Sequence, residues 1–103
     1  MPDKRYEVIV SERAMNMLTS HVGFFARVSK NAAVKLRDEI IAEMKALDFM
    51  PESYTWLSNE YIPANKYRKK QVGKRYLLIY QIIDNKVYID YVLDCRQDYG
   101  WLL

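Results

Sequence analysis

Residues 66–83 read KYRKKQVGKRYLLIYQII, and the two parts of this stretch differ sharply in character. The first ten residues hold six cations and no acid. The next eight, Tyr76–Ile83, are almost wholly hydrophobic and have the composition of a strong strand. Lys66–Val72 can also form a strand despite its charge, because β-propensity mainly reflects a half-buried pleated surface. Gly73 can supply the turn between these two strands.

A third strand is expected over Val87–Leu93, after a turn at Asp84-Asn85-Lys86 whose Asp and Asn tolerate turn geometry. Alternation at period two divides the Tyr76–Ile83 strand into two faces, with Leu78, Tyr80 and Ile82 on one and Leu77, Ile79 and Gln81 on the other. Neither face is polar. We therefore expect both faces to be covered, one by helices and the other by something else, such as a partner protein.

The N-terminal half predicts one strand and two helices. Tyr6–Val10 is strand-like and ends at Ser11, a good helix N-cap. Apolar residues then recur at helical spacing, at Ala14, Met17, Leu18, His21, Val22 and Phe25. A second helix is expected from about Asn31 to Leu47, capped by Ser29 or Asn31 and ended before Pro51. Its apolar stripe comprises Ala33, Leu36, Ile40, Met44 and Leu47.

Residues 51–64 predict a connecting loop whose Tyr54, Trp56 and Leu57 pack onto the core, although Trp56 could also stack on a base. The element order is then β-α-α-β-β-β, an α+β fold with an antiparallel-rich sheet and a helical hairpin on one face. A chain of 103 residues is expected to form a single domain, residues 1–103.

Composition excludes several classes of protein. The single Cys95 cannot form an internal disulfide, and His21 is the only histidine, so no metal site and no cofactor are expected. His21 lies on an apolar helical stripe, which favours a buried or boundary role over a catalytic one. There is no signal-like or membrane-spanning apolar run, so a cytoplasmic protein without membrane contact is expected.

The six cations of residues 66–75, called here the basic ribbon, are Lys66, Arg68, Lys69, Lys70, Lys74 and Arg75. A positive surface held on a rigid sheet suits a polyanion such as a nucleic-acid backbone, or an acidic partner protein. The alternative is a solvated strand face on which the lysine stems cover apolar surface. A non-catalytic nucleic-acid-binding module, with Tyr67 and Tyr76 stacking on bases, is also compatible with this pattern.

Three stretches together give the chain its resemblance to a known family. They are Ser11-Glu12-Arg13-Ala14 with Leu18, then Ser29–Leu36 continuing through Ile40 and Leu47 to Pro51, and finally Tyr67-Arg68, Gly73, Arg75–Tyr80, Asp84-Asn85-Lys86 and Arg96-Gln97-Asp98-Tyr99. In this order the chain resembles the RelE/ParE superfamily of toxins from bacterial type II toxin–antitoxin modules, and the second helix favours the ParE side. The resemblance implies a growth-inhibiting toxin, a function linked to plasmid stabilization, and a cognate antitoxin encoded by an adjacent gene.

The resemblance is compatible with two different cellular targets of the toxin. RelE-like members cleave mRNA on the ribosome, whereas ParE-like members poison DNA gyrase. In RelE-like toxins an Arg often follows the aromatic residue that opens the central strand, but here Leu77 follows Tyr76. An aliphatic side chain offers no bidentate contact to a phosphate, and no histidine lies near the C-terminus to move protons. Gyrase binding is therefore favoured over RNA cleavage.

If the protein does cut RNA, the candidate catalytic residues are Lys69, Lys70, Arg75, Arg96 and Tyr99. Arg96 joins the basic ribbon as a candidate target-binding residue, because in the family pattern an Arg emerges here from the last strand. A salt bridge with Asp94 or Asp98 is its alternative role. The apolar end, Gly100-Trp101-Leu102-Leu103, is expected either to dock on the sheet edge or to contact the antitoxin or target.

Overall fold

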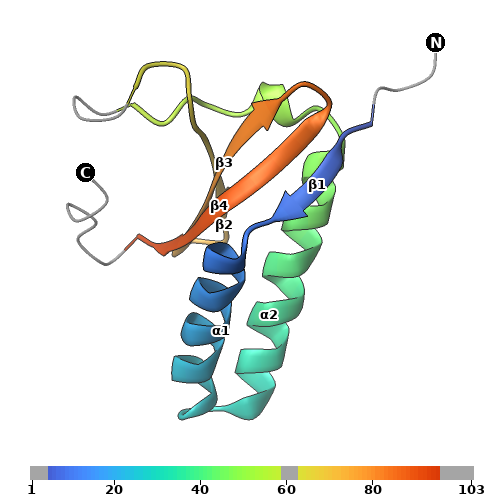
Figure 1. The fold of residues 1–103 in the computed structure, drawn as a ribbon. Helices are drawn as coiled ribbons and strands as arrows, with labels where there is room; N and C mark the ends of the chain where they lie inside the picture. Colours follow the sequence, from blue (N-terminus) through green and yellow to red (C-terminus); the bar gives the residue numbers. More distant parts are fainter. Residues whose placement is uncertain (1–4, 59–62, 96–103) are drawn as a thin grey trace.

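The computed structural model describes residues 5–58 and 63–95 and contains a four-stranded sheet and two α-helices (Figure 1). The elements follow in the order β1 (Glu7–Val10), α1 (Glu12–Ala26), α2 (Lys30–Lys45), β2 (Arg68–Val72), β3 (Tyr76–Ile83) and β4 (Lys86–Asp94). Two short 3-10 helices, η1 (Ala46–Asp48) and η2 (Pro51–Ser53), lie between α2 and β2. The predicted α+β fold and its β-α-α-β-β-β order are confirmed.

Both α-helices begin at serines, as the sequence predicted. The Ser11 and Ser29 hydroxyls accept hydrogen bonds from the backbone N–H groups of Ala14 and Ala32, which satisfies otherwise unpaired donors in each first turn. The second helix ends slightly earlier than expected, because residues 46–48 tighten into η1. Met50 then adopts a left-handed conformation with φ of 50°, and Pro51 opens η2.

The strand order in the sheet is β1-β4-β3-β2. β1 runs parallel to β4, and the other two pairs are antiparallel. Gly73, with φ of 60°, and Asp84, with φ of 58°, occupy the two hairpin turns in the left-handed region that such turns require. An irregularity at Ile79/Tyr80 leaves Asp90 as an extra residue in β4, because Ile79 pairs with Tyr91 while Tyr80 pairs with Ile89.

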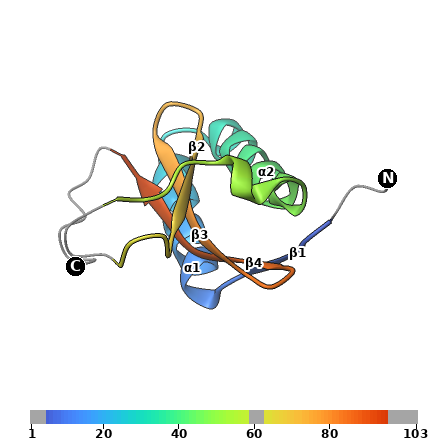
Figure 2. The same ribbon diagram turned by 90° about the horizontal axis from the view of Figure 1, so that it is seen from above.

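The helices cover one face of the sheet, and the main core lies between the two layers. Figures 1 and 2 show α1 and α2 side by side in an antiparallel hairpin. The core comprises Ala14, Leu18, Ile40, Met44, Leu47, Val72, Tyr76, Leu78, Tyr80, Val87, Ile89 and Val92. Residues of both predicted helical stripes lie in this core, although Phe25 does not. The predicted inward face of β3 is confirmed, with Leu78 and Tyr80 in the core and Ile82 packed against it.

The opposite side, called here the helix-free face, is formed by alternate strand residues. Two rows cross it, Lys69–Ile79–Tyr91 and Gln71–Leu77–Leu93, and Gln81 pairs with Tyr88 beyond the irregularity. Ile79 is 1 % exposed and Leu93 is 4 % exposed, so the apolar residues at the centre of this face are buried without a helix above them. No described helix is long and apolar enough to span a lipid bilayer.

Candidate functional site

The basic ribbon runs through the loop before β2, β2 itself and the β2–β3 turn, so the alternation of the strand decides where each cation points. Arg68 and Lys70 are paired across the sheet with Tyr80 and Leu78, which belong to the core face. Lys69 is paired with Ile79 on the helix-free face. The three cations within β2 are therefore divided between the two sides of the sheet.

Lys70 is turned into the protein. Its side chain is buried, and its ammonium group lies 3.1 Å from Glu43 Oε2 and donates to the Glu43 backbone carbonyl at 3.2 Å. The same nitrogen lies 5.1 Å from the centre of the Tyr54 ring. Lys70 thus joins β2 to the end of α2, and its charge is satisfied internally. Its inclusion in an exposed binding ribbon is corrected by this burial.

Arg68 is also engaged within the chain. Its guanidinium lies over Trp56, 3.7 Å from the ring centre, and donates to the Tyr54 carbonyl at 2.6 Å. Backbone bonds from Leu57 N–H to the Tyr67 carbonyl and from Lys69 N–H to the Thr55 carbonyl pair this loop with β2. Trp56 therefore packs on the loop–strand junction with one face against a cation. It remains 39 % exposed and does not join the core as predicted, whereas Tyr54 of the same loop packs against the core.

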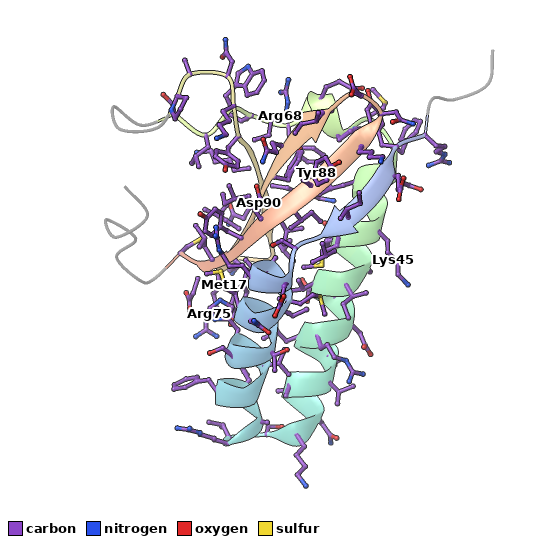
Figure 3. All side chains as sticks on the ribbon, in the orientation of Figure 1. Met17, Lys45, Arg68, Arg75, Tyr88 and Asp90 are labelled. Atoms are coloured by element: carbon purple, nitrogen blue, oxygen red, sulfur yellow. The ribbon has the colours of Figure 1, made fainter. Side chains whose placement is uncertain are left out.

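Four cations of the ribbon are left for contact with another molecule. Lys66 and Lys74 are exposed, while Lys69 and Arg75 are half-buried. The Lys66 ammonium lies 5.3 Å from the Tyr67 ring centre, and the Arg75 guanidinium lies 5.1 Å from that of Phe25 in α1. Arg68 and Arg75 lie at opposite ends of β2 (Figure 3). Lys74 and Arg75 line one hollow, Lys69 a second and Lys66 a third, so the remaining positive charge forms separate patches and not one continuous ribbon.

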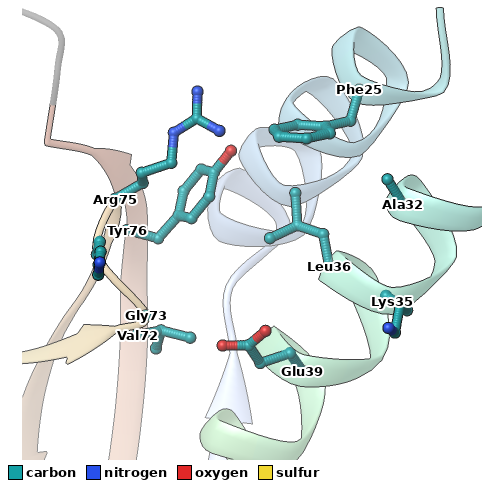
Figure 4. Close-up of a pocket in the computed structure, with 10 residues that line it drawn as sticks. Phe25, Ala32, Lys35, Leu36, Glu39, Val72, Gly73, Arg75 and Tyr76 are labelled. Carbon is teal, nitrogen blue, oxygen red and sulfur yellow. The ribbon is translucent and has the colours of Figure 1, made fainter. Parts of the chain in front are cut away.

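Leu77 and Arg75 line different hollows, and this separation bears on the choice between gyrase and RNA. Leu77, Lys69, Gln71 and Cys95 line a hollow of about 540 Å³ together with residues 53–55. Arg75 instead lines a groove beside the helices (Figure 4). Arg75 therefore does not reach the hollow of Leu77, the position at which the resemblance to RelE-like toxins would place an Arg. The one ribbon cation in the Leu77 hollow is Lys69.

A polar cluster on the helix-free face was not foreseen from the sequence. The Asp90 carboxylate accepts from Gln81 Nε2 at 2.8 Å, and Arg13 donates to the Tyr91 hydroxyl at 2.6 Å. Burial raises the pKa of the Tyr67 phenol above 10.0, and the charges of Asp90 and Tyr91 add to this rise. Tyr67 is thus protonated at neutral pH, where it can donate a hydrogen bond but cannot act as a base.

His21 has a structural role. Its Nε2 atom lies 2.8 Å from the Val92 carbonyl oxygen, and its ring lies 5.3 Å from that of Tyr76. Since a carbonyl can only accept, Nε2 carries the proton in this bond. The bond joins α1 to β4, in agreement with the boundary position predicted for His21.

The environment of Cys95 disfavours a reactive thiolate. Burial raises the pKa of the Cys95 thiol, and the charge of Asp94 raises it further, although Lys69 opposes the shift. A raised thiol pKa reduces the reactive thiolate at neutral pH. Within residues 5–58 and 63–95 no group of three His, Cys, Asp or Glu side chains is placed to hold a metal ion. Arg96, Tyr99 and residues 100–103, for which contacts were predicted, lie outside the described residues.

Comparison with known families identifies the chain. Residues 8–99 match the model of the ParE toxin of type II toxin–antitoxin systems, a span that runs from β1 past the end of β4. The chain belongs to the ParE toxin family. Curated protein sequences contain no significant match to it.

A solved structure shows the same fold as this ParE-family chain. It is described as the chromosomal ParDE toxin–antitoxin system from P. aeruginosa, and its matching chain superposes with a TM-score of 0.75. The match covers 88% of this chain and 97% of that chain, at 12% sequence identity. The ParE fold is therefore retained although most residues differ.

In this ParE-family chain the burial of Lys70 has a signal in the sequence. Val72 is an apolar residue two positions after Lys70, so period two alone places Lys70 on the inward face of β2. The Asp90 cluster had no such signal. It depends on the irregularity between β3 and β4, which shifts Asp90 relative to simple alternation.

Proposed function

We propose that this ParE-family toxin inhibits growth by binding DNA gyrase, without cleaving RNA. The observation that carries the proposal is the placement of Leu77 and Arg75 in separate hollows. A nuclease that stabilises charge on a transferring phosphoryl group needs a cation aimed at it. In the Leu77 hollow the described residues supply Lys69 alone, and Lys70 is committed to Glu43.

Binding to a protein target requires only a stable surface of suitable chemistry. The helix-free face supplies aromatic and apolar residues, Tyr88, Tyr91 and Leu77, with Lys69 and Arg13 among them. Aromatic residues and arginine are enriched at protein interfaces, and the aromatic side chains bury a large area with little loss of conformational freedom. We assign the target contact to this face, with Lys69 as its charged residue from the basic ribbon. Lys66, Lys74, Arg75 and Arg96 remain further candidates for contact with the target.

The second part of the proposal is neutralisation by a cognate antitoxin from an adjacent gene, in the cytoplasm. The family is defined by two-gene systems, and the similar P. aeruginosa structure is described as a ParDE system. Co-expression with the neighbouring small gene should relieve growth arrest and yield a stable complex. A chain that is harmless to cells and does not bind that gene product would contradict the toxin assignment.

The decisive experiment separates the two targets with purified components. Wild-type protein and the Leu77→Arg variant are each added to a gyrase supercoiling assay and to ribosomes programmed with a defined mRNA. We expect the wild type to inhibit supercoiling and to leave the mRNA intact. Leu77→Arg should not produce efficient cleavage, because no histidine lies near the C-terminus to move protons. Rapid codon-specific cleavage by the wild type would reverse the assignment in favour of ribosome-dependent mRNA cleavage.

A matched pair of variants locates the target contact. Tyr88→Ala changes the helix-free face, whereas Val34→Ala changes an exposed apolar residue on α2. We expect the first to weaken gyrase inhibition by about tenfold, as for an aromatic interface residue, and the second to leave it unchanged. Equal loss, or loss only with Val34→Ala, would move the contact to the helices.

A further inference from the structure

A hollow of about 380 Å³ lies at the end of β2 that carries Arg68 (Figure 3). The residues that line it include Tyr6, Glu52, Trp56, Lys66, Arg68 and Ile82, which come from distant parts of the chain. None of them lines the Leu77 hollow or the groove of Figure 4. Its volume falls within the range of about 300–1,000 Å³ that is usual for small-molecule sites. The hollow is therefore a separate cavity, large enough for one small ligand.

Arg68 contributes to this hollow a positive charge that is fixed in position but not neutralised. A backbone bridge sets Trp56 opposite Arg68, the guanidinium lies over the indole ring, and the Tyr54 carbonyl accepts from one of its nitrogens. Its Nε atom is buried and has no hydrogen-bond partner among residues 5–58 and 63–95. No carboxylate of these residues forms a salt bridge with it. Because a buried cationic donor is unfavourable without an acceptor, this environment favours an anion beside Arg68.

Lys66 supplies a second cation to the same hollow. Its side chain is exposed, and in the described part of the chain it forms no salt bridge. Asn65, which has a left-handed φ of 59°, adds an amide to the lining. Among the described residues that line the hollow, the one acid is Glu52, whose carboxylate accepts from the Tyr6 hydroxyl at 2.8 Å. The lining thus carries two cations and one carboxylate, an excess of positive charge.

We propose that this hollow binds a guanine nucleotide, with its phosphate held by Lys66 and Arg68, its base packed against Trp56, and the N–H groups of the base donating to Glu52. The inference goes beyond the proposed function, because it assigns a small-molecule site that neither gyrase nor an antitoxin requires. It rests on the lining of the hollow alone, so its failure leaves the toxin assignment untouched.

Each part of a guanine nucleotide matches one part of this lining. A phosphate monoester carries a charge of about −1.5 to −2 at neutral pH, which two cations balance. A flat base presents a π-face to an aromatic side chain, and the Trp56 side chain is 39 % exposed. Guanine has two adjacent N–H donors on its pairing edge, and a carboxylate such as Glu52 accepts both. Adenine has one donor and one acceptor there, so the carboxylate repels its ring nitrogen.

Titration calorimetry on the full chain tests the site, with GMP, AMP and inorganic phosphate as the probes. Wild type should bind GMP about tenfold more tightly than inorganic phosphate, because only the nucleotide has a base to pack against Trp56. Lys66→Gln should weaken GMP binding about tenfold through the loss of a charge-assisted contact. Lys74→Gln is the matched control, because Lys74 is an exposed lysine of the same basic ribbon that lines a different groove. It should stay within about twofold of wild type.

Glu52→Gln separates recognition of the base from a structural role of Glu52. The amide can still accept from the Tyr6 hydroxyl, but it offers both a donor and an acceptor to a bound base. Wild type should therefore prefer GMP to AMP, and Glu52→Gln should remove that preference while phosphate binding persists. Equal weakening of GMP and AMP would show a structural role and overturn the assignment of guanine. Circular dichroism and thermal melts verify that each variant is folded.

Three further results would overturn the proposal. The first is the absence of GMP binding to wild type at concentrations up to about 1 mM, or binding no tighter than that of inorganic phosphate. The second is an equal loss for Lys66→Gln and Lys74→Gln, which would place the ligand outside this hollow. The third is a single-stranded oligonucleotide that binds more tightly than GMP and is weakened by Lys66→Gln, which would identify a nucleic-acid site.

Discussion

Lys69 and Lys70 are neighbours in the sequence, yet they lie in opposite environments. Lys70 is 5 % exposed and pairs with Glu43 beneath α2, whereas Lys69 lies on the helix-free face beside Ile79 and Leu77. The difference arises from the alternation of β2 alone. The number of charged residues in a stretch of sequence is therefore a poor measure of the charge exposed to a partner, because a strand directs every second side chain inward.

The largest expected effect comes from the inward lysine. Lys70→Gln should lower the free energy of unfolding by about 2 kcal/mol, since it leaves Glu43 without its partner while part of that carboxylate remains solvated. Lys69→Gln should change it by less than about 0.5 kcal/mol. Urea denaturation at pH 7 measures both. Equal losses would mean that the two lysines are energetically equivalent despite their different burial.

The next largest effect on stability is expected for two tyrosines that lie on opposite faces of the sheet. The buried Tyr80 hydroxyl donates to the Pro51 carbonyl at 2.6 Å, while Tyr91 on the helix-free face accepts from Arg13. Tyr80→Phe should cost about 1–2 kcal/mol at pH 7, because it leaves the Pro51 carbonyl unpaired. Tyr91→Phe should cost less. Chemical denaturation of both variants decides the order.

Tyr80 also makes the stability of the protein depend on pH under alkaline conditions. Burial raises the pKa of Tyr80 well above its ordinary value of 10.0, so folding favours the neutral phenol. Its contribution is therefore complete below pH 10 and is lost as pH rises toward the folded-state pKa. We expect wild-type stability to fall as the pH rises above about 10, and Tyr80→Phe to fall less steeply. Identical pH slopes for the two proteins would contradict this assignment.

A smaller loss of stability is expected when Arg68 loses its contacts with the loop that precedes β2. Arg68→Lys keeps the charge but loses the planar stack on Trp56 and the fixed donor to the Tyr54 carbonyl. The expected loss of stability is about 1 kcal/mol. Lys66→Arg is the control, because Lys66 is exposed. A loss for the control as large as for Arg68→Lys would show that the stack contributes nothing specific.

The smallest effect on stability is expected for the outward cations, although their effect on binding is large. Replacing Lys69, Lys74 and Arg75 with Gln should leave the melting temperature nearly unchanged. It should lower the slope of log affinity against log salt for a single-stranded oligonucleotide by about two, at roughly 0.7 per phosphate contact. Lys70→Gln should leave that slope as in wild type. A reduced slope with Lys70→Gln would mean that Lys70 reaches solvent.

Element positions could be predicted closely, whereas the candidate site could be predicted only in part. Tyr76–Ile83 was expected as a strand and has the same bounds in the structure, because its composition and turn residues are local signals. Lys70 was expected to belong to an exposed ribbon and is instead buried. Its partner Glu43 is 27 positions away, on a helix whose own periodicity does not reveal what lies beneath it.

The sequence by itself determined the order of the elements, the caps of both helices and the two faces of β3. Each of these follows from residues within a few positions of one another, through periodicity, capping and turn geometry. Only the tertiary structure decided that Lys70 meets Glu43 and Arg68 stacks on Trp56, how Phe25, Leu36 and Arg75 form one groove, and where Asp90 lies. These features require the register of β3 on β4 and the packing of the hairpin on the sheet, which arise from contacts between residues far apart in the chain.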